Sequence, residues 1–256
     1  MLGMILVDDK RYIHTKNYLK TKGHIFCETD TPPQNLDFMI FPFAEDFDRV
    51  VYSDAYFAAA KPDTAIFSGI ENAYLAQKCL EHSLTYHVMM EDSNIARKNA
   101  VPTSEGVVAY LVANRQSTIA GSRVLVIGYG ICGGDLARRL AALGTDVYAL
   151  VRNRERELLA QDDGITPIYL HSLFEHGFDV IINTVPQTVL TDDMLGRLGG
   201  NVLLIDIASK PYGFNMALAR SLNEKSALLP GIPGKYAVKT SGEILGQYIQ
   251  AILRGR

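Results

Sequence analysis

One stretch near the middle of the chain limits its fold more than any other: an apolar run, a glycine-rich turn and an amphipathic segment follow one another directly. The run at 124–127 (VLVI) indicates a buried strand, and GYGICGG begins immediately after it. In this order Gly128 permits a tight turn, Gly130 lets the backbone approach a pyrophosphate, and Gly133 lets helix and strand pack closely. The context predicts a dinucleotide-binding βαβ unit and disfavours a turn that binds nothing.

The residues after the next strand indicate which dinucleotide is bound. Sites for NAD usually place an acid about twenty positions after the glycines, where it holds the ribose 2′-hydroxyl. Here the strand at 146–150 is followed by Val151-Arg152-Asn153-Arg154. An arginine fork grips a 2′-phosphate that an acid would repel, so Arg152 and Arg154 favour NADP(H) over NAD(H). Asn153 can serve a ribose hydroxyl, which keeps NAD possible, and the alternative is that both arginines are solvated residues at a helix start.

Short apolar strands alternate with amphipathic helices along the whole chain. This alternation predicts an α/β fold of two lobes: a smaller N-terminal flavodoxin-like α/β lobe and a C-terminal Rossmann-type doubly wound parallel sheet. The expected domains are 1–100 and 101–256, with a final helix at 242–253 packing back on the first lobe. We expect strands at 4–7, 38–42, 64–68, 86–89, 124–127, 146–150, 166–169, 180–183, 202–206 and 227–229. We expect helices at 12–22, 48–60, 72–82 and 103–114, the last capped by Thr103 ahead of Glu105.

Composition narrows the class of protein. With 48% apolar and 21% charged residues in 256, the chain has enough material for a real core. A net charge of −3 with scattered basic residues argues against nucleic acid. No apolar run reaches the roughly 20 residues of a membrane span, and the N-terminus lacks the basic start of a signal peptide. The three cysteines are widely spaced, which favours a reducing compartment and no metal cluster. We therefore expect a cytoplasmic protein that binds no membrane and no metal, and that forms a homo-oligomer.

Several segments at the ends of the predicted strands carry a more specific resemblance. The chain resembles the A subunit of dipicolinate synthase in NAVPTSEG (99–106), GYGICGGDLARRLAALG (128–144), INTVP (182–186), IDIASKPYGFN (205–215) and LPGIPGKYAVKTSGEIL (229–245). These cover most of 92–256 in that family's order. The chain departs from the family at Asp8 and Tyr212, where the family has glycine, and at Val238, where it has proline. Its N-terminal lobe is also shorter.

The resemblance implies an NADP-dependent oxidoreductase. Such an enzyme oxidises dihydrodipicolinate to the aromatic pyridine-2,6-dicarboxylate (dipicolinate) in spore formation, and it works with a B subunit that resembles a flavoprotein. Tyr212 is bulky, so a divergent relative acting on another substrate is an alternative.

The candidate site residues follow from the glycine loop and from this resemblance. For the cofactor we expect Gly128, Tyr129, Gly130, Ile131, Cys132, Gly133, Arg152, Asn153, Arg154, Thr184, Val185, Pro186, Ala208 and Ser209. A dicarboxylate substrate needs cations and hydrogen-bond donors, for which we expect Arg97, Thr103, Ser104, Lys239, Thr240 and Ser241, together with Lys235. A general base should take the ring proton; Lys235, Glu105 and Asp206 are the candidates, and the sequence does not choose among them.

Two other functions fit the same fold. D-2-hydroxyacid dehydrogenases share the two-lobed build but rely on a histidine late in the chain, whereas no histidine follows His176 here. None of the six histidines falls in a cleft motif, and we assign none to the site. The third possibility is a cofactor-binding subunit without activity of its own.

Overall fold

The computed structural model describes residues 1–6, 9–28, 32–42 and 54–255, which form two units. The first unit comprises Met1–Asn99 and Ala237–Arg256, and the second comprises Ala100–Tyr236. Helix α4 (Ser93–Asn114) has residues in both, and the C-terminal helix α10 (Val238–Arg254) belongs to the first. Among the described residues, none of the helices combines the length and apolar character needed to cross a bilayer.

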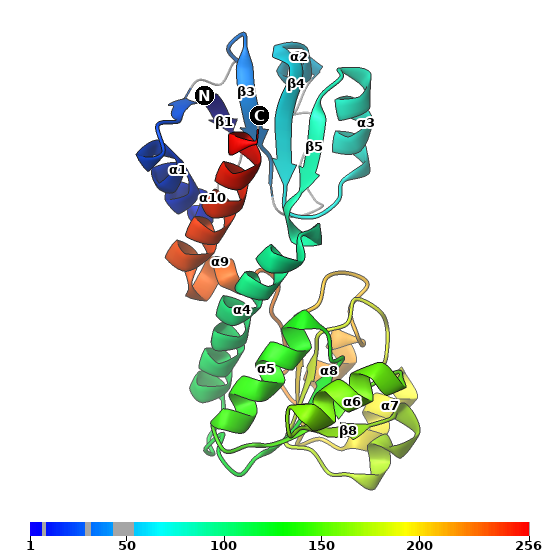
Figure 1. The fold of residues 1–256 in the computed structure, drawn as a ribbon. Coiled ribbons are helices and arrows are strands. Elements are labelled where there is room, and N and C mark those ends of the chain that lie inside the picture. The colour runs from blue at the N-terminus through cyan, green and yellow to red at the C-terminus, as the bar shows by residue number, and fades with distance from the viewer. Residues whose placement is uncertain (7–8, 29–31, 43–53, 256) are drawn as a thin grey trace. The chain divides into compact units, whose positions relative to one another are not determined.

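The first unit is a five-stranded sheet with helices on both faces (Figure 1). Its strands lie in the order β2-β1-β3-β4-β5, all parallel, which is the flavodoxin-like arrangement predicted from the sequence. Helices α1 and α10 cover one face, where Tyr12 and Leu245 share a core with Phe38. Helices α2 and α3 cover the other, where Phe57 and Leu75 are buried. The elements are β1 (Leu2–Ile5), α1 (Lys10–Thr21), β2 (Ile25–Cys27), β3 (Leu36–Ile40), α2 (Asp54–Ala58), β4 (Ala60–Ser68), α3 (Ala73–Glu81), β5 (Thr85–Val88) and the short 3-10 helix η1 (Met89–Glu91).

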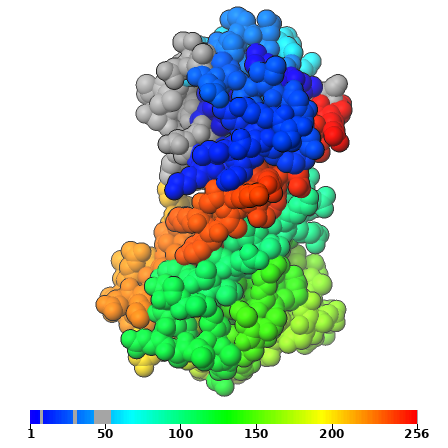
Figure 2. Space-filling view, turned by 90° about the vertical axis from the view of Figure 1, so that its left-hand side faces the viewer, coloured from blue at the N-terminus to red at the C-terminus, as the bar shows by residue number. Residues whose placement is uncertain are grey.

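Small residues allow α1 and α10 to pack closely against each other. A Cβ on Gly242 of α10 would lie 2.2 Å from the carbonyl oxygen of Arg11, and a Cβ on Gly246 would lie 2.8 Å from the Tyr18 ring. The buried Thr15 hydroxyl donates a hydrogen bond of 2.8 Å to the Gly242 carbonyl. In Figure 2 the blue residues of α1 and the red-orange residues of α10 lie against each other accordingly.

The second unit is a six-stranded parallel sheet in the order β11-β10-β9-β6-β7-β8. Counted from β6 as the first strand, this is the Rossmann order 3-2-1-4-5-6. The C-terminal half of α4, with α5 and α6, covers one face, and α7, α8 and η2 cover the other. The elements are β6 (Arg123–Ile127), α5 (Ile131–Ala142), β7 (Asp146–Leu150), α6 (Arg154–Asp162), β8 (Thr166–Ile168), η2 (Leu170–Glu175), β9 (Val180–Asn183), α7 (Asp192–Leu198), β10 (Leu203–Asp206), α8 (Met216–Leu222), β11 (Ala227–Leu228) and α9 (Pro233–Tyr236).

The prediction of a helix beginning at Thr103 was wrong. Helix α4 begins at Ser93, because the Asp92 carboxylate accepts the N–H groups of Asn94 at 2.8 Å and Ile95 at 3.1 Å and so caps the helix there. Pro102 lies inside the helix without ending it. Thr103 and Glu105 are therefore mid-helix residues and not part of a first turn.

Other boundaries also differ from the predicted ones. The edge strand β2 was not predicted. Strand β4 begins at Ala60, where the sequence predicted the end of a helix at 48–60. Residues 48–53 of that helix and residue 7 of the predicted first strand lie outside the described residues. The final helix, predicted at 242–253, is α10; it begins earlier, at Val238, and the short helix α9 precedes it.

Candidate cofactor-binding site

A cavity of about 1090 Å³ opens at the carboxyl ends of β6, β7 and β9 in the second unit. Ligands of open parallel sheets bind at this edge. The lining residues are Ile127, Gly128, Tyr129, Gly130, Ile131, Cys132, Gly133, Leu150, Val151, Arg152, Arg156, Tyr169, Leu170, His171, Thr184, Val185, Pro186, Gln187, Thr188, Val189 and Met194. Ten of the residues predicted to bind the cofactor are in this set.

Glycine stands at each of the three loop positions for a different physical reason. Gly128 has φ of 92°, a left-handed conformation, and its Cβ would lie 2.5 Å from Val185 Cγ2. At Gly133 a Cβ would lie 2.1 Å from the Gly128 carbonyl oxygen, so only glycine allows β6 and α5 to approach. At Gly130 a Cβ would meet no atom within 4 Å, although the residue lines the cavity. Glycine at 130 therefore keeps space open for a ligand, while the other two serve the packing of the chain itself.

The start of α5 presents unsatisfied N–H groups to this space. Gly130 is the N-cap residue and has no side chain with which to accept a bond from the first turn. Free first-turn N–H groups and the helix dipole favour an anionic group. Cys132 also lines the cavity, and burial, with a smaller contribution from the Asp135 carboxylate, raises the pKa of its thiol to about 12. The thiol therefore adds no negative charge near neutral pH.

A hydrogen-bonded group on α5 and α6 holds the loop in place. The Tyr129 hydroxyl donates to Asp163 Oδ2 at 2.7 Å, and Arg138 Nη1 donates to the same oxygen at 2.7 Å. These bonds, that of Tyr129 first, hold the pKa of the Asp163 carboxyl below its ordinary value. From the other side Arg156 Nη1 donates to the Tyr129 carbonyl at 3.3 Å. The loop is thus fixed by both ends of α6, with Arg138 of α5 supporting Asp163.

The arginines after β7 divide into two sets. Arg152 and Arg156 line the cavity, whereas Arg154 forms an ion pair with Glu157 and its side chain is 67% exposed. Asn153 is the N-cap of α6 and accepts the Arg156 N–H at 3.0 Å. The sequence reasoning missed Arg156, although it stands in the same Arg-rich run.

The opposite wall of the cavity contains Thr184, Val185 and Pro186, which were predicted from the sequence, and His171, which was not. Thr184 donates its hydroxyl to the Ile127 carbonyl at 2.8 Å, which ties the end of β9 to the glycine loop. His171 lines the cavity, and its ring stacks on that of Tyr169 with the centroids 6.0 Å apart. No histidine was assigned to the site from the sequence, and His171 is the one that lines this cavity among the described residues. It lies in η2, which follows β8 at the same edge of the sheet, so strand order places it there without a sequence motif.

Comparisons with known proteins agree with this geometry. Residues 94–226 match the family model of the D-isomer specific 2-hydroxyacid dehydrogenase, NAD binding domain. The A subunit of dipicolinate synthase from Bacillus subtilis (strain 168) is 31% identical over 245 residues, which are 90% of this chain and 82% of that protein. The chain belongs to the family of the dipicolinate synthase A subunit.

A solved structure of this family agrees with the assignment, and a more distant one shares the fold. The crystal structure of the dipicolinate synthase A subunit from Bacillus halodurans has a TM-score of 0.89 and 27% identity, covering 98% of this chain and 97% of that one. D-lactate dehydrogenase from Escherichia coli shares the fold, with a TM-score of 0.67 at 14% identity and coverage of 100% and 97%. The second unit is thus the nicotinamide-nucleotide-binding domain of an oxidoreductase.

In this member of the dipicolinate synthase family, Asp206 organises the loop after β10. Its carboxylate is buried and accepts the N–H of Gly213 at 2.6 Å, the N–H of Ala208 at 2.9 Å and Asn183 Nδ2 at 3.0 Å. Burial raises the pKa of Asp206, and these bonds oppose the rise. Tyr212 has φ of 70°, the left-handed conformation that suits the glycine usual in the family. The backbone therefore keeps a glycine-like shape despite the substitution.

Four residues that were predicted to bind the cofactor do not line the cavity, and neither do the three candidate catalytic residues. Asn153, Arg154, Ala208 and Ser209 are absent from the described residues that line the cavity. Glu105 on α4 is exposed, 3.8 Å from Arg139 Nη1. At Gly106, the next residue, a Cβ would lie 2.1 Å from Cγ2 of Ile232, just before α9, and 2.9 Å from Cδ2 of Tyr236 in α9. This contact brings α9, which carries the exposed Lys235, against the segment that carries Glu105.

The residues predicted to bind substrate come from both units. Thr103 and Ser104 belong to the second, and the Ser104 hydroxyl is buried without a hydrogen-bond partner among the described residues. Arg97, Lys239, Thr240 and Ser241 belong to the first. Arg97, Lys239 and Thr240 are exposed, and Ser241 is buried. Their roles toward a substrate stay predictions.

Proposed function

We propose that this chain is an NADP-dependent oxidoreductase that converts dihydrodipicolinate to pyridine-2,6-dicarboxylate in the cytoplasm during spore formation. The observation that carries the proposal is the relation to the A subunit of a dipicolinate synthase along 90% of the chain. The cavity at the glycine loop supports it, because its open space at Gly130 and its free helix N-terminus fit a dinucleotide pyrophosphate. When bound, the oxidised nicotinamide accepts a hydride.

The residues of the cavity suggest how the chain would hold the cofactor. We assign the pyrophosphate to the first-turn N–H groups of α5 and the nicotinamide side to Thr184, Val185 and Pro186. Arg152 and Arg156 are the cations available for a 2′-phosphate, and Arg156 is already oriented by its bond to the Tyr129 carbonyl. Arg156 also lies 3.7 Å from Glu155 Oε1, whereas Arg154 pairs with Glu157, does not line the cavity and is left out of this assignment.

Aromatisation removes one hydride and one proton from the substrate, so the chain must supply a proton acceptor and cations for two carboxylates. We assign the carboxylates to Lys235, Lys239 and Arg97, and the proton to Lys235 or Glu105. Asp206 has its carboxylate bonded to three groups of its own loops, and we assign it the positioning of that loop. A homo-oligomeric assembly and a flavoprotein-like B subunit are part of the same proposal.

A second candidate is a dehydrogenase of D-2-hydroxy acids, which the match to that family's NAD-binding domain favours. Those enzymes use a histidine late in the chain, and His176 is the last one here. The dipicolinate reaction therefore has the better support.

A turnover assay tests the reaction. The purified chain with its B subunit should form pyridine-2,6-dicarboxylate and NADPH from dihydrodipicolinate and NADP, and should not oxidise D-lactate. Lys235→Ala should lower kcat by about a hundredfold, in the range for loss of a general base or a bound charge, with NADPH affinity unchanged. Lys22→Ala, an exposed lysine of the first unit, is the matched control.

Each negative result of this assay has a distinct meaning. Binding of NADPH without turnover in the presence of the B subunit would indicate a protein that holds the cofactor without catalysis, and would refute the reaction. Oxidation of D-lactate instead would move the chain to the second candidate.

The choice of cofactor is tested with three arginine variants. Arg152→Ala and Arg156→Ala should each weaken NADPH binding about tenfold or more, the loss expected for a charge-assisted hydrogen bond. Arg152→Ala should leave NADH binding nearly unchanged, and Arg156→Ala should weaken NADH less than NADPH, because Arg156 also bonds the Tyr129 carbonyl. Arg154→Ala is the matched control, because its guanidinium already pairs with Glu157. Fluorescence titration of both cofactors gives the ratio of dissociation constants. A ratio that changes only in Arg154→Ala would contradict the assignment.

A further inference from the structure

A second cavity, of about 530 Å³, lies at the opposite edge of the same sheet. It opens at the amino ends of β9, β10 and β11, whereas the cofactor cavity is at the carboxyl ends. Its volume is within the roughly 300–1,000 Å³ typical of small-molecule sites. A dinucleotide bound in the first cavity would not reach this edge, so it does not account for the polar side chains gathered here.

The lining is almost entirely polar and contains two cations. Arg115 follows α4, and Lys225 precedes β11; neither makes an ion pair with a described residue. Leu203 is the apolar residue of the wall. The remaining lining residues are Asn114, Gln116, Ser117, Asp179, Asn201, Asn223 and Glu224, so carboxamides and a hydroxyl surround the two cations.

The guanidinium of Arg115 is held in place and still lacks an acceptor. Its Nη2 donates to the hydroxyls of Ser117 at 3.0 Å and Ser122 at 2.9 Å, which fix the plane of the group. Its Nε is buried and has no hydrogen-bond partner among the described residues. The buried Nε offers no surface to a ligand, but Nη1 makes no hydrogen bond to a described residue, so this donor is left for an acceptor from water or a ligand.

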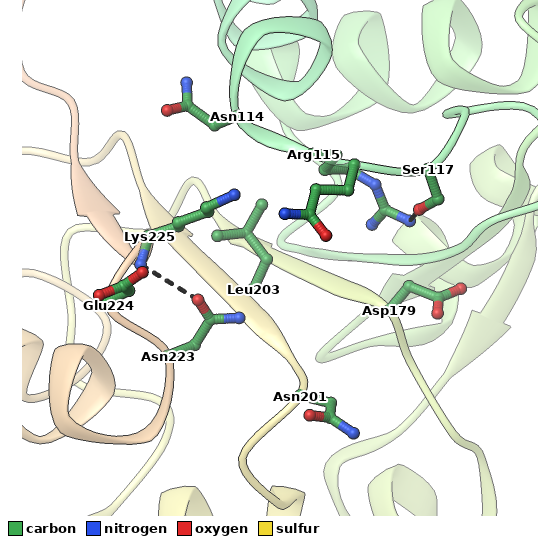
Figure 3. A pocket seen from close by; sticks show the side chains of 10 residues that line it. Asn114, Arg115, Ser117, Asp179, Asn201, Leu203, Asn223, Glu224 and Lys225 are labelled. Atoms are coloured by element: carbon green, nitrogen blue, oxygen red, sulfur yellow. Dashed lines mark hydrogen bonds between the residues drawn. The ribbon is translucent and has the colours of Figure 1, made fainter.

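Hydrogen bonds of its backbone N–H and carbonyl hold Lys225 in place, so its ammonium group is not needed for this. Its N–H donates to Asn223 Oδ1 at 3.1 Å, and its carbonyl accepts the Tyr110 hydroxyl at 2.8 Å. Since Tyr110 stands on α4, one helix anchors both cations of the cavity. In Figure 3 the Lys225 side chain extends toward Leu203, between the segments that carry Asn114 and Asn223.

The two carboxylates of the lining point away from Leu203. Figure 3 shows the carboxylates of Glu224 and Asp179 pointing to opposite sides, away from Leu203. Asp179 Oδ2 accepts the Arg123 N–H at 2.7 Å. At the end of α4, Asn114 Nδ2 caps the Tyr110 carbonyl at 2.9 Å. The lining therefore carries two cations and two carboxylates, and Figure 3 places the carboxylates on its two sides, with the Lys225 side chain between them.

We propose that this cavity is a second binding site, for a small polar carboxylate whose anionic group binds Arg115 and Lys225. A planar carboxylate matches the guanidinium edge, and the surrounding carboxamides suit hydroxyl or amino substituents on the same molecule. The site is separate from the proposed reaction, so its occupant acts as an effector and not as the substrate.

Calorimetric titration of the full chain saturated with NADPH tests this site, because the dinucleotide keeps anions out of the first cavity. The probes are succinate, L-malate and L-glutamate, with inorganic phosphate as the non-carboxylate anion. We expect at least one carboxylate to bind more tightly than phosphate. Lys225→Glu should weaken that binding about tenfold or more, as for loss of a charge-assisted hydrogen bond, and Lys22→Glu should not change it.

The variants separate a ligand site from a structural brace. Lys225→Glu replaces an exposed side chain, so its NADPH affinity and its melting temperature should stay as in the parent. Arg115→Lys keeps the positive charge but loses the planar guanidinium, so it should also weaken carboxylate binding. Absence of binding by all three carboxylates, tighter binding of phosphate, or equal affinity in Lys225→Glu would each overturn the proposal.

Discussion

Gly133→Ala is expected to abolish measurable NADPH binding, although the change adds a single methyl group. The added Cβ would lie 2.1 Å from the Gly128 carbonyl oxygen and 3.0 Å from Thr184 Oγ1. Both are held: Gly128 N donates to the Leu150 carbonyl at 3.0 Å, and the Thr184 hydroxyl bonds the Ile127 carbonyl at 2.8 Å. The helix must therefore move away from the strand. Its first-turn N–H groups then no longer face the cavity.

We expect the dissociation constant of NADPH to rise more than about a hundredfold, because several charge-assisted hydrogen bonds to the pyrophosphate are lost together. The fold should lose about 1–3 kcal/mol, the usual cost of overpacking. Fluorescence titration measures the first effect and urea unfolding the second.

Two neighbouring glycines supply the controls for this result. Gly134→Ala adds the same methyl one residue later in α5, where the nearest atom is Arg138 Nη1 at 3.4 Å. It should leave NADPH binding unchanged and raise stability by up to about 1 kcal/mol through better helix propensity. Gly130→Ala should leave stability nearly unchanged, since no atom lies within 4 Å of the added Cβ. It should nevertheless weaken NADPH binding, because it places a methyl group in the cavity. Native affinity in Gly133→Ala would contradict the role of this residue.

Both sheets and the glycine loop were predictable because they depend on local patterns. Apolar runs that alternate with amphipathic helices determine parallel sheets, and the loop follows one such run directly. The start of α4 was not predictable in the same way, because Thr103 and Asp92 are both plausible caps and only the structure shows Asp92 making the bonds. A helix with proline inside it also contradicts the usual local preference.

The choice between Arg154 and Arg156 illustrates why site residues are harder to predict than folds. Which face of α6 each arginine occupies depends on where that helix begins, and Asn153 sets this as its N-cap. Arg154 then stands three residues before Glu157 and pairs with it, while Arg156 turns to the Tyr129 carbonyl. His171 was missed for a different reason: strands distant in the chain bring η2 to the cavity, and no motif marks it.

Gly242→Ala is expected to destabilise the first unit strongly although it lies near the C-terminus. A Cβ there would lie 2.2 Å from the Arg11 carbonyl oxygen and 2.7 Å from His14 Cβ. Backbone and Cβ atoms of a helix cannot move aside alone, so α10 must separate from α1. That movement breaks the 2.8 Å bond from Thr15 and opens the core around Leu245 and Tyr12.

We expect Gly242→Ala to lose about 2–3 kcal/mol of unfolding free energy, at the upper end for overpacking a close contact. Thr15→Ala should lose less, about 1–2 kcal/mol, because it removes one buried hydrogen bond without forcing the helices apart. Gly196→Ala is the matched control: it lies in α7 with no atom within 4 Å of its Cβ, so better helix propensity should raise stability by up to about 1 kcal/mol.

Hydrogen exchange locates the effect, since α10 belongs to the first unit and the nucleotide-binding sheet to the second. Protection of β1 and β3 should fall in Gly242→Ala, while that of β6 and β9 and the affinity for NADPH should remain as in the parent. Loss of protection in β6 instead would mean that the C-terminal helix supports the nucleotide-binding domain and not the first sheet.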